Sequence, residues 1–101
     1  MTETLRKPED CGSMADLRQQ IDALDRDLVA KLALRSHYID RAVVLKQAEG
    51  LPANIPARVE DVVARVRANA EAEGLDPDLI ERLWRDLIDW SIARESRHLV
   101  P

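Results

Sequence analysis

Residues 16–49 read DLRQQIDALDRDLVAKLALRSHYIDRAVVLKQAE, and this stretch decides the fold. Its apolar residues recur mostly at intervals of three and four, the spacing that lines them up along one face of an α-helix. The members of this apolar stripe are Leu17, Ile21, Leu24, Leu28, Leu32, Ile39, Ala42 and Val43. Ser13 followed by Asp16 resembles the capping box that starts a helix, whereas Gly50 and Pro52 end one. The pattern predicts a single helix of about 35 residues, ~50 Å long.

Two shorter segments with helical spacing follow this stretch. The first opens at Pro56, a residue suited to a first turn, and ends at Gly74. The second opens at Asp76 and Pro77, an N-cap residue followed by proline, and extends to about His98. The faces expected to point inward carry Val59, Val62, Val63, Val66 and Ala70 in the first segment, and Ile80, Leu83, Trp84, Leu87 and Ile88 in the second. The sequence therefore predicts an all-α bundle of one long and two shorter helices.

The chain of 101 residues corresponds to one domain. Residues 1–12 are polar and lack periodicity, so we expect them to form an N-terminal arm ahead of a helical domain over residues 13–101. A compact domain of this size has a diameter of ~30–35 Å, which is shorter than the long helix. Most of the apolar stripe must therefore be covered by another chain or by the shorter helices.

A domain this small usually needs a disulfide, a metal ion or a partner chain for extra stability. The cysteine and histidine content disfavours the first two, so we expect oligomerisation. Cys11 is the single cysteine of the sequence, so an intrachain disulfide is excluded. Cys11, His37 and His98 match no metal-ligand spacing, and we expect neither a metal nor another cofactor.

The composition bears on partners and on location. The formal net charge is −4 and aromatic residues are 3%, which argues against nucleic-acid binding. No apolar run approaches the ~20 residues that a membrane span needs, and residues 1–8 lack the apolar core of a signal peptide. The unpaired cysteine agrees with a reducing compartment, so we expect a cytoplasmic protein.

Three cationic residues interrupt or flank the long apolar stripe. Arg35 and Lys46 are eleven residues apart, so they lie on nearly the same face, ~16 Å apart along the axis. Their side chains either extend to water or converge on a small anion between them. Arg18 lies ~25 Å from Arg35 along the helix, too far to grip the same small molecule within one chain. Arg18 is thus either a surface residue or a ligand contributed by a second, antiparallel subunit.

Two polar residues continue the apolar line of the last segment. Ser91 and Glu95 are one helical turn apart and extend the row of Ile80, Trp84 and Leu87. A carboxyl group in that position is either exposed at a frayed helix end or buried with a partner. A protonated Glu95 would donate a hydrogen bond, whereas an ionised one can only accept.

Taken together, these motifs resemble the all-helical chorismate mutases over roughly residues 8–98. The resemblance rests on the run from Asp16 to Asp25, on Leu32-Ala-Leu-Arg35, on Lys46, on Pro52 with Arg58, and on Ser91 with Glu95. The opening Lys7-Pro-Glu-Asp-Cys11 looks more like the branch of the family that contains the isochorismate pyruvate lyases of salicylate and siderophore synthesis.

The resemblance implies an intertwined homodimer with two sites, each built from both chains around a small dicarboxylate. Arg18 would enter from the partner subunit and bind one carboxylate, and Arg35 would bind the other. Lys46 would donate to the ether oxygen and to a carboxylate. The expected catalytic residues are thus Lys46, Arg35 and Glu95.

The resemblance also implies roles for three further positions. Arg58 matches an arginine that helps to close the site, and Ser91 matches a serine that contacts a carboxylate in some mutases. Glu95 falls where bacterial mutases and lyases typically carry glutamine, the second donor to the ether oxygen. Fungal relatives use glutamate there, which donates only when protonated.

Two apolar positions depart from the housekeeping mutases. Val59 stands where those enzymes carry a glutamate that holds the substrate hydroxyl, and the lyase branch is also apolar there. Ile55 replaces an aspartate near the same pocket. These two departures favour a lyase-like pocket or a slower mutase. From the family resemblance as a whole, the expected activity is the rearrangement of chorismate to prephenate, with the conversion of isochorismate to salicylate and pyruvate as the alternative. A non-enzymatic helical dimerisation module is the contrasting interpretation.

Overall fold

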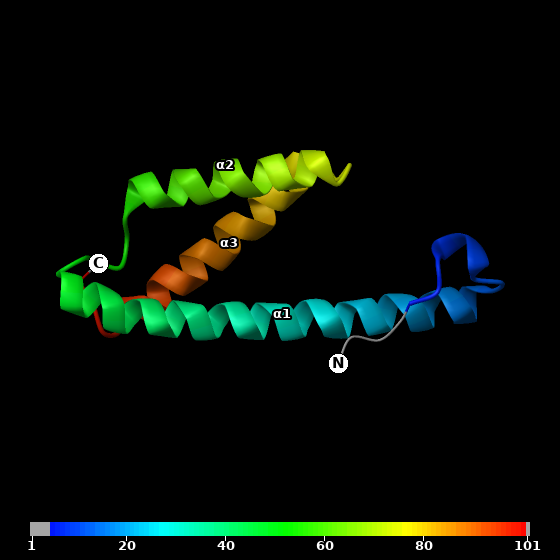
Figure 1. Cartoon of the computed structure of the whole chain (residues 1–101), viewed down its shortest axis with the longest axis horizontal. Helices are drawn as coiled ribbons and strands as arrows, with labels where there is room; N and C mark the ends of the chain where they lie inside the picture. Colours follow the sequence, from blue (N-terminus) through cyan, green and yellow to red (C-terminus); the bar gives the residue numbers. More distant parts are fainter. Residues whose placement is uncertain (1–4, 101) are drawn as a thin grey trace. The chain divides into compact units, whose positions relative to one another are not determined.

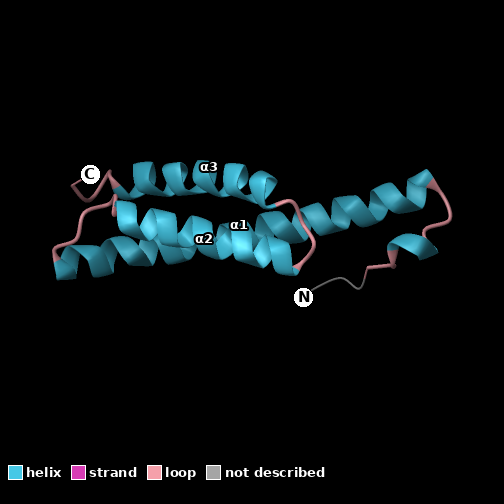
Figure 2. Cartoon of the chain, turned by 90° about the horizontal axis from the view of Figure 1, so that it is seen from above, coloured by secondary structure: helices cyan, strands magenta, loops and turns pink. Residues whose placement is uncertain are grey.

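The computed structural model describes residues 5–100 and confirms an all-helical chain (Figures 1 and 2). A short 3₁₀ turn at Pro8–Asp10 precedes α1 (Met14–Glu49), α2 (Pro56–Ala72) and α3 (Pro77–Glu95). Over the described residues no strand is present. The ends of the expected arm and of the expected domain, residues 1–4 and 101, lie outside the described part. The prediction of one long and two shorter helices is confirmed.

The chain divides into two compact units, one up to Tyr38 and one from Ile39 onward, and α1 contributes to both. In the first unit, the Ser13 hydroxyl accepts a hydrogen bond from the Asp16 N–H at 3.1 Å, as the capping pattern predicts. Ahead of it, the Arg6 guanidinium lies 3.4 Å from the Asp16 carboxylate, and the Arg6 N–H donates to Gln20. The segment from residue 5 to 12 therefore folds back onto the first turns of α1.

The second unit is built by α2 and α3, which pack along one another, and by the last turns of α1 (Figure 1). Pro56 and Pro77 each occupy a first helical turn, and Gly50 and Gly74 adopt the positive φ values that end α1 and α2. The buried apolar side chains of this unit are small or branched: Val43, Ala53, Val63, Ala70 and Ile88. The core is therefore thin.

Charged side chains join the outer faces of α2 and α3. Arg85 makes a two-pronged ion pair with Glu60 at 3.0 and 3.2 Å. It also makes a single ion-pair contact with Glu81 at 2.8 Å. Arg67 reaches Glu81 and Asp78 at 2.9 and 3.0 Å. The hydrogen bonds that Arg85 donates to Glu60 and then to Glu81 raise the pKa of its guanidinium above the ordinary value. This network fixes the position of α2 relative to α3 along the helix axes.

The last helix is shorter than the sequence predicts, because α3 ends at Glu95 and not near His98. The N–H groups of His98 and Leu99 both donate to the Glu95 carbonyl at 3.0 Å, which closes a turn. The chain then runs back to the loop between α1 and α2, where the Val100 carbonyl accepts from the Ala53 N–H at 2.8 Å. This long-range backbone bond holds the chain after α3 against that loop.

The apolar stripe of α1 is largely uncovered in the single chain. Ile21, Leu28 and Leu32 are 47%, 53% and 41% exposed. On α3, Leu83 was expected to point inward and is 49% exposed, so that prediction is wrong for the single chain. Separately, no helix among the described residues combines the length and the apolar character that a bilayer crossing demands.

Replacing Asp76 tests the local logic of the fold. The Asp76 carboxylate accepts a hydrogen bond from the Asp78 N–H at 2.9 Å and caps α3. We expect Asp76→Ala to lower the free energy of unfolding by about 1 kcal/mol, since it leaves a helix N–H without an acceptor. Asp76→Asn keeps the acceptor and serves as the control. Urea unfolding at a fixed chain concentration measures both variants, and equal losses in the two would contradict the capping role.

Candidate active site

The side chains of Lys46 and Glu95 meet in the second unit, where the last turns of α1 pass the end of α3. The Lys46 Nζ atom lies 2.9 Å from Oε1 of Glu95. The same ammonium group donates a hydrogen bond to the Ala53 carbonyl at 2.9 Å. An ammonium group has three N–H donors, so the hydrogen bond to Ala53 and the contact with Glu95 leave at least one N–H for a ligand.

Glu95 is buried, with 4% of its surface exposed, so of the two alternatives that its position leaves open the structure has the buried carboxyl with a partner. Its Oε1 atom is inaccessible and accepts no hydrogen bond from the residues that the structure describes. The contact with Lys46 is thus a close ion pair without hydrogen-bond alignment. A buried oxygen with spare acceptor capacity beside an ammonium group is typical of a site that holds a polar ligand.

Ser91 precedes Glu95 by one turn of α3 and is equally buried, at 4% exposure. Its hydroxyl donates to the Leu87 carbonyl at 2.8 Å, within the helix. The face of α3 on which the sequence places Ser91 and Glu95 therefore points inward at its C-terminal end. Two buried polar groups lie on that face.

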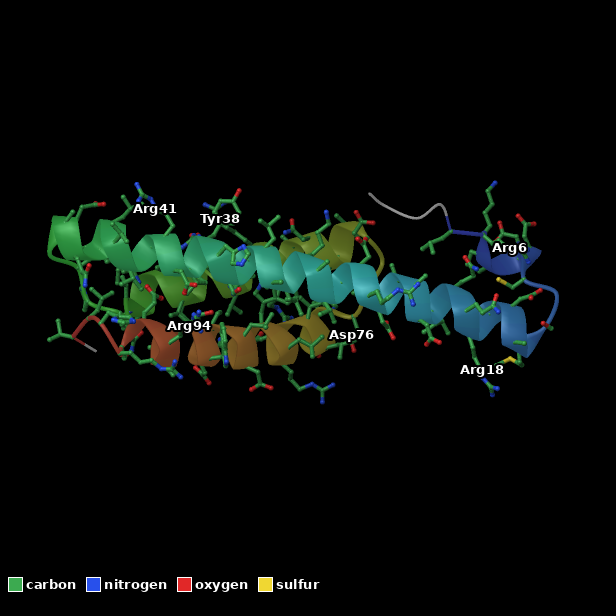
Figure 3. All side chains as sticks on the ribbon, turned by 90° about the horizontal axis from the view of Figure 1, so that it is seen from below. Arg6, Arg18, Tyr38, Arg41, Asp76 and Arg94 are labelled. Atoms are coloured by element: carbon green, nitrogen blue, oxygen red, sulfur yellow. The ribbon has the colours of Figure 1, made fainter. Side chains whose placement is uncertain are left out.

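Arg35 and Arg18 belong to the first unit. Arg35 is partly buried, and this burial lowers the pKa of its guanidinium. A cation that is partly withdrawn from water favours an anionic partner over solvent. Arg18 is exposed and extends from the first turns of α1 (Figure 3).

Arg58 opens α2 and lies on an exposed face, where its guanidinium pairs with Asp61. The ion pair joins Arg58 Nη1 to Asp61 Oδ2 at 2.6 Å. Hydrogen bonds from Arg65 and then Arg58 lower the pKa of the Asp61 carboxyl. The structure therefore brings Lys46 and Glu95 together, with Ser91 one turn away, and places Arg58 on a separate ion pair.

Two features of the site carry no sequence signal. The Ala53 carbonyl that receives Lys46 is a backbone group in a loop. The second feature is a two-pronged ion pair at 2.6 and 3.0 Å between Arg94 and Asp40, which are 54 residues apart. Hydrogen bonding to Asp40 raises the pKa of Arg94. This pair fastens the end of α3 to α1 beside the Lys46 contact.

A pocket of about 350 Å³ lies on the flank of this arrangement, and its lining differs from the expected site. The residues that line it are Asp40, Val43, Gln47, Arg94, Arg97 and His98. Lys46, Ser91 and Glu95 are not among them. No group of three or more histidine, cysteine or carboxylate side chains suited to a metal ion occurs among residues 5–100.

Comparison with known proteins places this geometry in a family. The chain is 36% identical over 95 residues to the isochorismate pyruvate lyase of Pseudomonas aeruginosa. The matched region covers 93% of this chain and 92% of that protein. It is 34% identical over 85 residues to the T-protein of Haemophilus influenzae, but it spans 22% of that longer protein. It is 23% identical over 86 residues to the chorismate mutase of Methanocaldococcus jannaschii.

The family match covers most of the chain and contains the contact described above. Residues 17–96 match the family described as chorismate mutase type II. Lys46, Ser91 and Glu95 all fall inside that range, as do all of α2 and α3. The chain belongs to the type II chorismate mutase family.

Proposed function

We propose that the chain is a chorismate mutase, which rearranges chorismate to prephenate without a cofactor. The single observation that carries this proposal is the Lys46 ammonium, fixed between the Ala53 carbonyl and buried Glu95 within a chain of this family. An ammonium group held in this way is positioned before the substrate arrives, so no reorganisation is needed as charge develops.

The chemistry demands only shape and charge. In the rearrangement, one C–O bond breaks while one C–C bond forms within the same molecule. A site accelerates it by holding the dicarboxylate in a compact conformation and by stabilising negative charge on the ether oxygen. We assign the first task to Arg18 and Arg35, whose guanidinium groups grip carboxylates with two hydrogen bonds each. Lys46, with Glu95 in its protonated form, takes the second task. Ser91 and Arg58 are assigned to a carboxylate and to closure of the site.

Isochorismate pyruvate lyase activity is the second candidate, and a specific observation favours it. The Pseudomonas aeruginosa lyase matches this chain over almost the full length of both proteins. The start of α2 is apolar at Ile55 and Val59, which are both half-buried. An apolar wall offers no partner for a substrate hydroxyl. The same cationic cage can fold isochorismate for an elimination that yields salicylate and pyruvate.

We also propose that the functional unit is an intertwined homodimer with shared sites. The uncovered stripe of α1 supports this, because several large apolar side chains on one helix face need a partner surface. A second α1 in antiparallel orientation covers the stripe and brings the partner's Arg18 toward Arg35. A purely structural dimerisation module accounts for the stripe but not for the buried Lys46–Glu95 pair.

Replacing Lys46 tests the proposed activity. We expect Lys46→Ala to lower kcat by about 10²–10³-fold, because one preorganised donor to the breaking bond is lost. Loss of chorismate absorbance and appearance of salicylate fluorescence from isochorismate, measured in parallel, identify the reaction. Lys7→Ala, on the exposed segment ahead of α1, is the matched control. Near-normal turnover by Lys46→Ala, or turnover of neither substrate by the unaltered chain, would overturn the proposal.

Replacing Glu95 tests the second donor. An amide donates at every pH, whereas a carboxyl donates only when protonated. We therefore expect Glu95→Gln to raise kcat/KM by about tenfold at neutral and alkaline pH, with the advantage shrinking as the pH falls. Glu71→Gln, at an exposed position on α2, is the control. A pH profile that the Glu95 substitution leaves unchanged would remove Glu95 from the mechanism.

Mixing two damaged chains tests whether the sites are shared. Arg18→Ala and Lys46→Ala each damage both sites of their own dimer. In a random mixture, half of the dimers contain one chain of each variant. One of the two sites in each such dimer is intact, so about a quarter of all sites in the mixture are intact. We expect this fraction of activity to return after co-refolding the two variants. Absence of any recovery, with mixed dimers shown by mass spectrometry, would mean that each site lies within one chain.

A further inference from the structure

Ala53 connects two distant parts of the second unit through its backbone. Its carbonyl accepts the hydrogen bond from Lys46 at 2.9 Å, and its N–H donates to the Val100 carbonyl at 2.8 Å. The residue itself is 2% exposed, so its own N–H and carbonyl are shielded from water. The segment after α3 is thus linked to the Lys46 ammonium through one buried alanine.

The loop around Ala53 is stiff enough to transmit this link. Pro52 immediately precedes Ala53 and Pro56 opens α2, so two of the neighbouring φ angles are fixed by proline rings. Ile55 is further restricted because it precedes a proline. A displacement of the Ala53 N–H therefore moves its carbonyl as well, since few backbone rotations can absorb the change.

The 96–100 segment has two further attachments around the same ion pair. Gln47, the residue after Lys46, donates from its side-chain amide to the His98 carbonyl at 3.3 Å. His98 and Leu99 both donate to the carbonyl of Glu95 at 3.0 Å. The segment therefore contacts Ala53, the neighbour of Lys46 and the backbone of Glu95. Residues 98–100 therefore hold Ala53, whose carbonyl fixes the ammonium, and the backbone of the residue whose carboxyl pairs with it.

We propose that the 96–100 segment is a positioning strap for Lys46, acting through the Ala53 backbone and the end of α3. This inference rests on the proposed function of Lys46 as the donor to the breaking ether bond. The strap touches no substrate. It holds the Ala53 carbonyl where it orients one N–H of the ammonium, so that another N–H faces the reacting oxygen.

Shortening the chain tests the strap. We expect a chain ending at His98 to lose kcat by tenfold or more while its KM changes less than threefold. The carboxylates are gripped by the arginines, whereas Lys46 acts mainly as the bond stretches, so the loss falls on kcat. Removal of Pro101 alone and Val100→Ala are the matched controls. The first leaves an acceptor oxygen at position 100 as part of the terminal carboxylate, and the second keeps the backbone carbonyl and changes only the side chain. Both controls are expected to retain full kcat.

Amide hydrogen exchange of Ala53, followed by NMR, provides a readout that does not depend on turnover. We expect the Ala53 N–H to be protected in the full chain and to exchange at least tenfold faster in the chain ending at His98. Gln47→Leu keeps the full length and removes the attachment to the His98 carbonyl. If the shortened chain does not fold, a smaller loss of kcat in Gln47→Leu, with KM retained, supports the strap, and unchanged kcat there overturns it.

The outcomes separate the strap from the function on which it rests. Full kcat in a folded chain ending at His98, or unchanged exchange of the Ala53 N–H, overturns the strap and leaves the mutase or lyase activity standing. If the unaltered chain turns over neither chorismate nor isochorismate, the proposed function fails, and with it the catalytic purpose of the strap. Equal loss of kcat in Val100→Ala also overturns the strap, since a side chain would then be responsible.

Discussion

A lysine ammonium and a glutamate carboxyl face each other at 2.9 Å where α1 passes the end of α3, and the carboxyl is almost inaccessible to water. Withdrawing two charges from water is unfavourable by several kcal/mol for each ion, and one contact seldom returns all of it. An apolar pair of similar size would stabilise the helix contact as well or better. The pair of Lys46 and Glu95 is therefore better explained by what it does to a ligand than by what it does to the fold.

Ion pairs around Lys46 and Glu95 restrict the movement of the helices that carry them. The ion pair of Arg94 with Asp40 fastens the last turn of α3 to α1, and the Arg94 guanidinium also lies over the Trp90 ring, 5.4 Å from its centroid. The charged network between α2 and α3 fixes the register of the helix that carries Glu95. Exposed ion pairs contribute little each, but a network of two-pronged pairs restricts sliding between helices. Rigidity around the pair matters because a donor displaced by 1 Å loses much of its effect on the transition state.

Local rules allowed the helices to be predicted from the sequence, and the site only in part. Ser13, Pro56 and Asp76 mark helix starts through contacts within a few residues, and those boundaries hold. The spacing of Ser91 and Glu95 indicated a shared face, and both are buried. The bond from the Ala53 N–H to the Val100 carbonyl joins residues far apart in sequence, and the acceptor for the Lys46 ammonium is the backbone carbonyl of Ala53. Such bonds leave no trace in residue type, since any residue except proline offers the same N–H and every residue the same carbonyl.

A carboxyl beside Lys46 has a consequence for the proposed reaction that an amide would not have. An ionised carboxylate at this position would present a negative charge to an incoming dicarboxylate, 2.9 Å from the ammonium that is proposed to act on it. Binding then either displaces Lys46 from Glu95 or brings a proton to Glu95. The second route turns the obstacle into a donor, because a neutral carboxyl gives a hydrogen bond to the ether oxygen beside the one from Lys46. Both routes are specific to a carboxyl, because an amide at the same position carries no charge and donates a hydrogen bond without taking up a proton.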